Sequence, residues 1–110
     1  GGIFFADGDS GADEYRGQIK YSHSNNDFVF AINAAEGMRL NSTGLGIGTS
    51  SPAVGLHVVN SVDPTVIFES TNAGSSGSRL QLYHNSVSPA DNDIICNIQL
   101  KSNRSGYIKL

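Results

Sequence analysis

The segment GLGIG constrains the fold of this chain more than any other stretch of its sequence. It places a glycine at every second position: Gly44, Gly46 and Gly48. In an extended strand, side chains two residues apart share a face, so the glycines form one bare face and Leu45 and Ile47 occupy the other. A bare face lets a second backbone approach closely. The pattern favours a strand packed against other chains, such as three identical chains around an axis, with a flexible glycine-rich linker as the alternative.

The same glycines do not fit a nucleotide-binding loop. A dinucleotide fingerprint needs G-x-G-x-x-G at the start of a helix, whereas here Thr-Ser-Ser-Pro follows the alternating glycines. Glu69 lies near the distance expected of a ribose-binding acid, but no βαβ unit surrounds the motif. No Lys follows the glycines as it does in a P-loop. We therefore expect no cofactor.

An internal repeat runs through the chain. When the sequence is shifted by 63 residues, Ile3–Arg16 aligns with Val66–Arg79 without a gap. After a three-residue insertion, Asn26–Ile32 aligns with Asn92–Ile98. Further on, the sequence GMRL resembles the final GYIKL of the chain. The matches are few, but they occur in the same order in both copies.

The repeat predicts two units. The first covers residues 1–62 and includes a glycine-rich connector at 41–52, and the second covers residues 63–110. The second copy stops where the first enters its glycine stretch, so we expect the second unit to be truncated.

Each unit has the pattern of short β-strands. Gly17–His23 alternates apolar and polar side chains, as a half-buried strand does, and Arg79–His84 repeats the alternation. Asp27–Asn33 is apolar on both faces, which suits a strand covered from two sides. Ile94–Leu100 again alternates.

Polar segments separate these strands. Ser24–Asn26 predicts a hairpin turn, and the glycine-rich segments DGDSGAD and TNAGSSGS predict loops at matching positions of the two units. Asn33–Met38 has room for one helical turn at most. The predicted fold class is all-β, built from meanders of short strands.

The composition excludes several classes of protein. The 110 residues carry a net charge of -3 without any run of Lys or Arg, which argues against nucleic acid as a partner. No apolar run is long enough to span a membrane, so membrane insertion is not expected. Cys96 is the only cysteine, so an intrachain disulfide is excluded. Only 38% of the residues are hydrophobic and Trp is absent, which suggests that other subunits complete the core.

Two N-terminal motifs resemble functional sites. Asp7, Asp9 and Asp13 are spaced like the start of a calcium loop, but Ala12 and Gln18 replace the Gly and the acid that an EF-hand needs. A solvated acidic loop is favoured, with these three acids as weak candidates for a metal site. The sequence GDSG matches the surroundings of a serine nucleophile, yet no His and Asp precede it as that fold requires. We therefore predict no catalytic residue and no enzymatic activity.

Aromatic and imidazole side chains lie at corresponding strand ends of the two units. They are Tyr21, His23, Tyr83 and His84. Such groups can stack on sugars, which makes them candidates for a glycan contact, although packing at a half-buried interface is the favoured interpretation. The histidines and Cys96 have no zinc-ligand spacing within one strand or loop.

The segment AAEGMRLNSTGLGIGTSSPAVGLHV, residues 34–58, resembles the repeated element of bacteriophage tail fibres and related virion appendage proteins. In that family, a strand of the type E-x-M-R-I/L precedes a short turn, the motif G-x-G-I-G-T-x-x-P and an L-x-V strand. The matching residues are Glu36, Met38, Arg39, Leu40, Gly44, Gly46, Ile47, Gly48, Thr49, Pro52, Leu56 and Val58. The resemblance covers residues 16–58 well and the second unit loosely.

The resemblance implies an elongated parallel homotrimer whose β-modules follow a three-fold axis, with strands that interdigitate or pack around it. Together with the apolar and glycine patterns, it makes these residues the candidates for trimer packing: Phe28, Phe30, Ile32, Gly44, Leu45, Gly46, Ile47 and Gly48. The implied role is structural, in a virion tail fibre outside the cell, with other tail proteins as partners.

Two further functions remain open from the sequence. The segment could itself be a receptor-binding adhesin that contacts host surface polysaccharide through its loops. A polysaccharide depolymerase is the third alternative, and it requires two suitably placed carboxylates.

Overall fold

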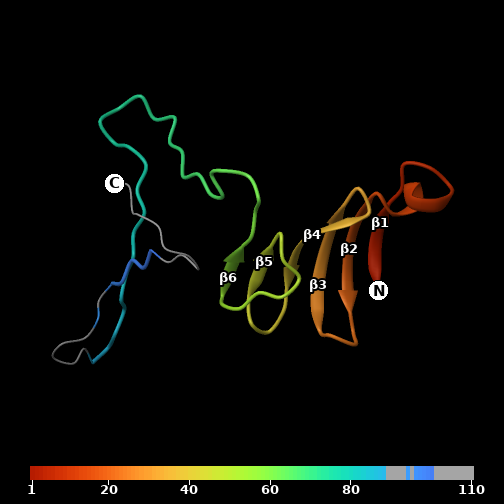
Figure 1. Cartoon of the computed structure of the whole chain (residues 1–110), viewed down its shortest axis with the longest axis horizontal. Helices are drawn as coiled ribbons and strands as arrows, with labels where there is room; N and C mark the ends of the chain where they lie inside the picture. Colours follow the sequence, from red (N-terminus) through yellow and green to blue (C-terminus); the bar gives the residue numbers. More distant parts are fainter. Residues whose placement is uncertain (89–93, 95, 101–110) are drawn as a thin grey trace. The chain divides into compact units, whose positions relative to one another are not determined.

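The computed structural model describes residues 1–88, 94 and 96–100. These residues belong to two compact units, Gly1–Ile67 and Phe68–Leu110. All strands of the described residues lie in the first unit (Figure 1). They are β1 (Gly2–Phe5), β2 (Gly17–Ser22), β3 (Asp27–Ile32), β4 (Ala35–Leu40), β5 (Leu45–Ile47) and β6 (Leu56–Val58).

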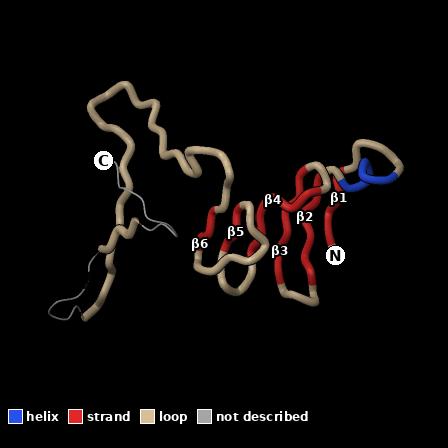
Figure 2. Tube along the Cα trace, viewed as in Figure 1, coloured by secondary structure: helices blue, strands red, loops and turns tan. Residues whose placement is uncertain are grey.

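The six strands form one open sheet in which spatial order follows chain order (Figure 2). Neighbouring strands are antiparallel from β1 to β5, and β6 runs parallel to β5. A single 3-10 helix, η1 (Gly11–Tyr15), lies in the loop between β1 and β2, and the described residues contain no α-helix. The predicted all-β class is confirmed.

Two tight turns build the central antiparallel part of the sheet. The predicted hairpin turn before β3 is confirmed, and Asn26 adopts a positive φ of 53° within it. Between β3 and β4 the turn has only two residues, Asn33 and Ala34, with φ values of 52° and 60°. Two consecutive positive φ values define the type I′ hairpin, whose twist matches that of the flanking strands.

The single helical turn for which Asn33–Met38 has room does not form. Ala35–Leu40 forms β4, which pairs with β3 in register on both sides of a bulge between Phe30 and Ala31. A sharp turn at Asn33 returns the chain directly alongside β3, where strand pairing satisfies the backbone groups that one helical turn would leave unpaired.

The register places apolar side chains on one side of the sheet. Ile19, Phe30 and Met38 lie opposite one another across β2, β3 and β4, and Ile47 continues the row on β5. We call this side the apolar face; its residues are Ile3, Phe5, Ile19, Tyr21, Phe28, Phe30, Ile32, Met38, Leu40, Leu45, Ile47, Leu56 and Val58.

The other side, which we call the opposite face, carries the charged residues. Its members are Phe4, Gln18, Lys20, Ser22, Asp27, Val29, Ala31, Glu36, Arg39, Gly46 and His57. The prediction that Leu45 and Ile47 point away from the glycine between them is confirmed.

The short connection between β5 and β6 explains the alternating glycines. Parallel strands usually need a crossover of a dozen or more residues, yet this one passes directly over β5. A Cβ atom added at Gly46 would collide with the Thr49 carbonyl oxygen, and one added at Gly44 with the carbonyl oxygens of Val54 and Gly55. We call residues 49–55 the strap.

The backbone that approaches the glycines therefore belongs to the same chain, where the sequence pattern led us to expect a neighbouring one. Backbone hydrogen bonds fix the arrangement: Leu45 N–H donates to the Gly55 carbonyl at 3.0 Å, and Val59 N–H to the Ile47 carbonyl at 2.9 Å. The pattern is explained within one chain, and a role of these glycines in trimer packing stays a prediction.

The first unit has almost no core of its own. Among the described residues, the buried ones are Asp27, Val29, Gly46 and Pro52. All but Pro52 lie on the opposite face, and Pro52 belongs to the strap that covers Gly46 on that face. The opposite face is thus partly covered by the chain itself.

The second unit contains no strand among its described residues. The strands predicted at 79–84 and at the described part of 94–100 are therefore wrong for this chain alone. An alternating strand is stable only beside a partner strand or layer, and here Leu80, Leu82 and Ile98 remain exposed. The repeat positions Asn92, Asp93 and Ile95 and the final GYIKL lie outside the described residues.

No helix in the described part of the chain has the length and apolar character needed to cross a membrane.

Candidate interaction surface

The apolar face is the most unusual surface of the first unit. Eight of its thirteen residues are between 37% and 72% exposed: Ile3, Phe5, Ile19, Phe28, Ile32, Leu40, Ile47 and Leu56. It contains no charged side chain. Sheets are normally covered on at least one side by a second layer, and soluble monomers rarely expose a continuous apolar surface of this extent.

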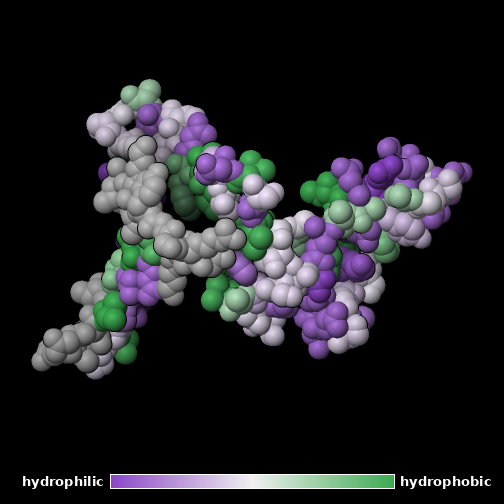
Figure 3. All heavy atoms as spheres, viewed as in Figure 1, coloured by the Kyte–Doolittle hydropathy of each residue, from purple (hydrophilic) through white to green (hydrophobic). Residues whose placement is uncertain are grey.

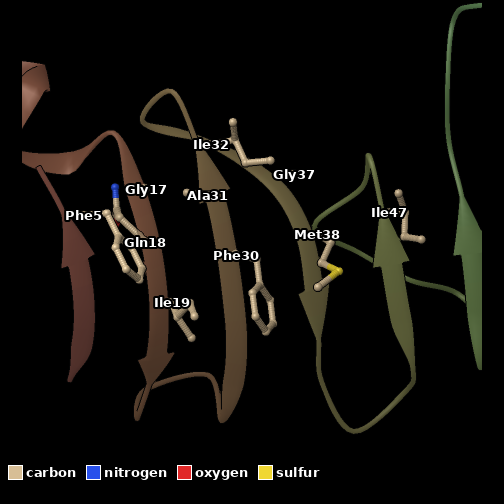
Figure 4. Close-up of a pocket in the computed structure, with 10 residues that line it drawn as sticks. All are labelled: Phe5, Gly17, Gln18, Ile19, Phe30, Ala31, Ile32, Gly37, Met38 and Ile47. Carbon is tan, nitrogen blue, oxygen red and sulfur yellow. The ribbon is translucent and has the colours of Figure 1, made fainter. Parts of the chain in front are cut away.

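A shallow groove of about 450 Å³ runs across the middle of this face. In Figure 4 the side chains of Ile19, Phe30 and Met38 lie next to one another on successive strands. The groove is lined by Phe5, Gly17, Ile19, Phe30, Ile32, Gly37, Met38 and Ile47, and also by Gln18 and Ala31, whose side chains the register places on the opposite face. Its apolar side chains provide no group that would activate a substrate, but they suit the packing of another apolar surface.

On the opposite face, three charged residues join β3 to β4. The Arg39 guanidinium donates to the Asp27 carboxylate at 2.5 Å and holds both oxygens of Glu36, at 2.8 and 2.5 Å. The hydrogen bonds from Arg39 hold the pKa of Glu36 below its usual value, and the carboxylates raise the pKa of Arg39 further. Lys20 also contributes to the lowered pKa of Glu36.

Asp27 is the most deeply buried member of this network. Its side chain is 3% exposed, and its Oδ1 atom has no hydrogen-bond partner among the described residues. A buried carboxylate is tolerated only when a cation compensates its charge. Arg39 supplies that cation. We therefore interpret the network as structural, since it connects Asp27 of β3 to Glu36 and Arg39, which lie on either side of the bulge in β4.

The structure does not bring the three candidate acids of the N-terminal loop together as a metal site. Asp13 forms an ion pair with Arg16 at 2.5 Å, and its backbone carbonyl accepts a hydrogen bond from Asp7 N–H. Residues 1–88, 94 and 96–100 contain no group of three or more His, Cys, Asp or Glu side chains placed to hold a metal ion. Hydrophilic groups gather over this loop at the N-terminal end of the sheet (Figure 3).

Tyr21 and His23, two candidates for glycan contact, do meet in space. Their rings pack edge to face with centroids 4.9 Å apart, and Tyr21 lies at the same distance from Phe28. The Tyr21 hydroxyl donates to the Asn26 side chain at 3.2 Å. Tyr83 and His84 lie in the second unit outside any strand, and Tyr83 is 75% exposed.

The candidates for trimer packing fall into two groups. Phe28, Phe30, Ile32, Leu45 and Ile47 all belong to the apolar face. The three glycines lie instead beside the strap or, for Gly48, against the Val59 carbonyl.

The sequence reasoning missed several members of the apolar face. Met38 and Leu40 alternate with small or polar residues, whereas Phe4 separates Ile3 from Phe5, and the sequence did not show that residues 2–5 and 35–40 belong to the same sheet. The Arg39 network was missed as well. The sequence shows that Glu36 and Arg39 are three residues apart. It does not show the bulge in β4 that brings the two side chains to the same face.

Comparison of the chain with known protein families, curated proteins and solved structures found no match.

Proposed function

We propose that this chain is a non-enzymatic structural module, a segment of a homotrimeric bacteriophage tail fibre that supports attachment to a host cell. The observation that carries the proposal is the uncovered apolar face of a single-layer sheet. Within the first unit, the sheet has one buried apolar strand residue, Val29, and no second layer of that unit covers it as in ordinary domains. In the proposed fibre, surface buried between further copies of the chain compensates for the missing layer.

The resemblance of residues 34–58 to tail-fibre repeats supports the same function. The structure gives this motif a physical role, since its glycines accommodate the strap and its Glu and Arg form the network on the opposite face. The described arginine-bound acids, Asp13, Asp27 and Glu36, serve as structural ion pairs rather than as a catalytic pair.

Light scattering coupled to gel filtration tests the proposed assembly. The expected particle has three times the mass of the chain and an elongated shape, which elutes earlier than a compact protein of that mass. A particle with the mass of one chain and a cooperative unfolding transition would contradict the proposal, because it would show that the sheet needs no partner.

A receptor-binding role is the second candidate, and the cluster of Tyr21, His23 and Phe28 favours it. Aromatic rings at the end of a hairpin present flat apolar surfaces on which sugar rings stack. Glycan-array binding that is lost in Tyr21→Ala and retained in Tyr15→Ala would support an adhesin. Equal binding by both variants, or no binding by the unmodified chain, would contradict the adhesin role. The cluster would then serve only in packing.

A further inference from the structure

We propose that copies of this chain pack on one another through the apolar face, and that the opposite face, with its strap and its Arg39 network, points outward. This inference rests on the proposed oligomeric function and specifies which surface forms the interface. The sequence pattern had placed both the apolar residues and the bare glycines at the contact between chains; this inference keeps the apolar residues there and takes the glycines out of the contact.

The available area fits such an interface. Eight residues of the apolar face are 37–72% exposed. At about 200 Å² for each large apolar residue, they offer on the order of 800 Å² of surface, which is the share that one partner contributes to a stable protein–protein interface. Burial of this area would also supply the core that the isolated unit lacks.

The distribution of charge also favours a second copy over a charged partner. Lys20, Asp27, Glu36 and Arg39 all lie on the opposite face. A charged partner would bury its charge on this face without a counter-charge, whereas a second copy brings an equally uncharged surface. The apolar face is the side of the sheet on which copies meet without burying a charge.

The second unit of the same chain is the competing occupant. Its described residues include apolar side chains that are themselves exposed, such as Leu82, Ile94 and Ile98, at 48–73%. A cover for the apolar face needs a polar outer side and a folded layer, and the described part of the second unit contains no strand. Since the second unit repeats the apolar pattern of the first, it has the same need for a partner.

Thiol labelling of the full chain tests which face is covered. In a Cys96→Ser background, Ile19→Cys places a thiol on the apolar face, and the matched Gln18→Cys places one on the opposite face of the same strand. We expect the thiol at position 19 to react with iodoacetamide at least tenfold more slowly than the one at position 18 while the chain is assembled. Dilution that dissociates the particle should abolish the difference.

The outcomes separate this inference from the proposed function. Equal labelling of both thiols in a particle of three chains would overturn the inference and leave the fibre function standing. A protected position 19 in a single-chain particle would overturn both, because the second unit would then be the cover. Protection in a particle of another size would support the interface and contradict the trimer.

A pair of charge substitutions gives an independent measurement. Ile19→Lys introduces a charge into the proposed interface, and Gln18→Lys adds the same charge on the outward face. We expect Ile19→Lys to weaken self-association at least 100-fold, while Gln18→Lys changes it less than threefold. Equal effects of the two substitutions would overturn the inference.

Discussion

At the scale of single residues, Gly46 determines how the β5–β6 connection packs. A Cβ atom at this position would meet the Thr49 carbonyl oxygen and would lie 3.1 Å from the Thr49 methyl group and 3.4 Å from the Pro52 ring. Backbone atoms cannot move aside as the end of a flexible side chain can, so even one methyl group displaces the strap.

We therefore predict that Gly46→Ala lowers the free energy of unfolding by about 1–3 kcal/mol, as overpacking does in a well-packed interior. Urea denaturation at fixed protein concentration measures the change. Gly55→Ala is the matched control, because no atom lies within 4 Å of an added Cβ there. Equal effects of the two substitutions would show that the strap does not pack on Gly46.

Glu36 gives the molecule a predictable response to acid. The ordinary pKa of its carboxyl group is 4.5, and the hydrogen bonds from Arg39 lower the pKa in the folded sheet. A carboxyl group with a lowered folded pKa stabilises the folded state above pH 4.5, and this contribution is lost as the pH falls below that value through the folded pKa.

The expected result is that Glu36→Gln flattens the dependence of the unfolding midpoint on pH below 4.5. Thermal unfolding across a series of acidic buffers provides the measurement. Glu14→Gln, which removes an acid from η1 away from Arg39, corrects for the loss of one negative charge. An unchanged slope in Glu36→Gln would mean that the Arg39 network does not persist in solution.

At the scale of secondary-structure elements, the β3–β4 hairpin contains a strained position. Ala34 has a φ of 60°, a region that costs an L-residue with a Cβ atom about 1–2 kcal/mol. Glycine adopts this conformation without that cost but loses more backbone entropy on folding.

The net expectation is that Ala34→Gly stabilises the sheet by about 0.5–1 kcal/mol, since Asn-Gly is the preferred pair for a type I′ turn. A rise in the urea midpoint with an unchanged slope would agree with this. Ala53→Gly in the strap is the control at a position where the structure shows no positive φ, and it should not stabilise. A loss of stability in Ala34→Gly would contradict the assigned turn.

The sequence predicted a strand well when the strand that pairs with it lies close by in the sequence. The strands around Ile19 and Phe30 were predictable because hairpin neighbours are close in sequence and their alternation is strong. β4 was indicated only by the resemblance to the E-x-M-R-I/L strand, because the Asn33–Ala34 turn lacks the glycine that usually marks a type I′ hairpin.

The candidate surface was predictable only in part, for the same physical reason. Phe28 and Phe30 indicated an interface, but a residue-by-residue pattern does not reveal that β1 and β5 extend the same face. The sequence correctly predicted that another backbone segment approaches the glycines closely. A strand face without side chains does not specify whether that backbone belongs to the same chain or to another.

At the scale of the whole molecule, the central claim is that the sheet is stable only when other copies cover its apolar face. Anything that binds the folded state and not the unfolded state makes stability depend on concentration. For an obligate oligomer, folding and association are therefore a single equilibrium, and the folded fraction falls when the chain is diluted.

The most direct test combines sedimentation velocity with far-ultraviolet circular dichroism over a dilution series of the unmodified chain. The account predicts a three-chain particle at high concentration and a loss of β-sheet signal over the same concentrations at which the particle dissociates. A particle that dissociates into single chains with an undiminished β-sheet signal would contradict it.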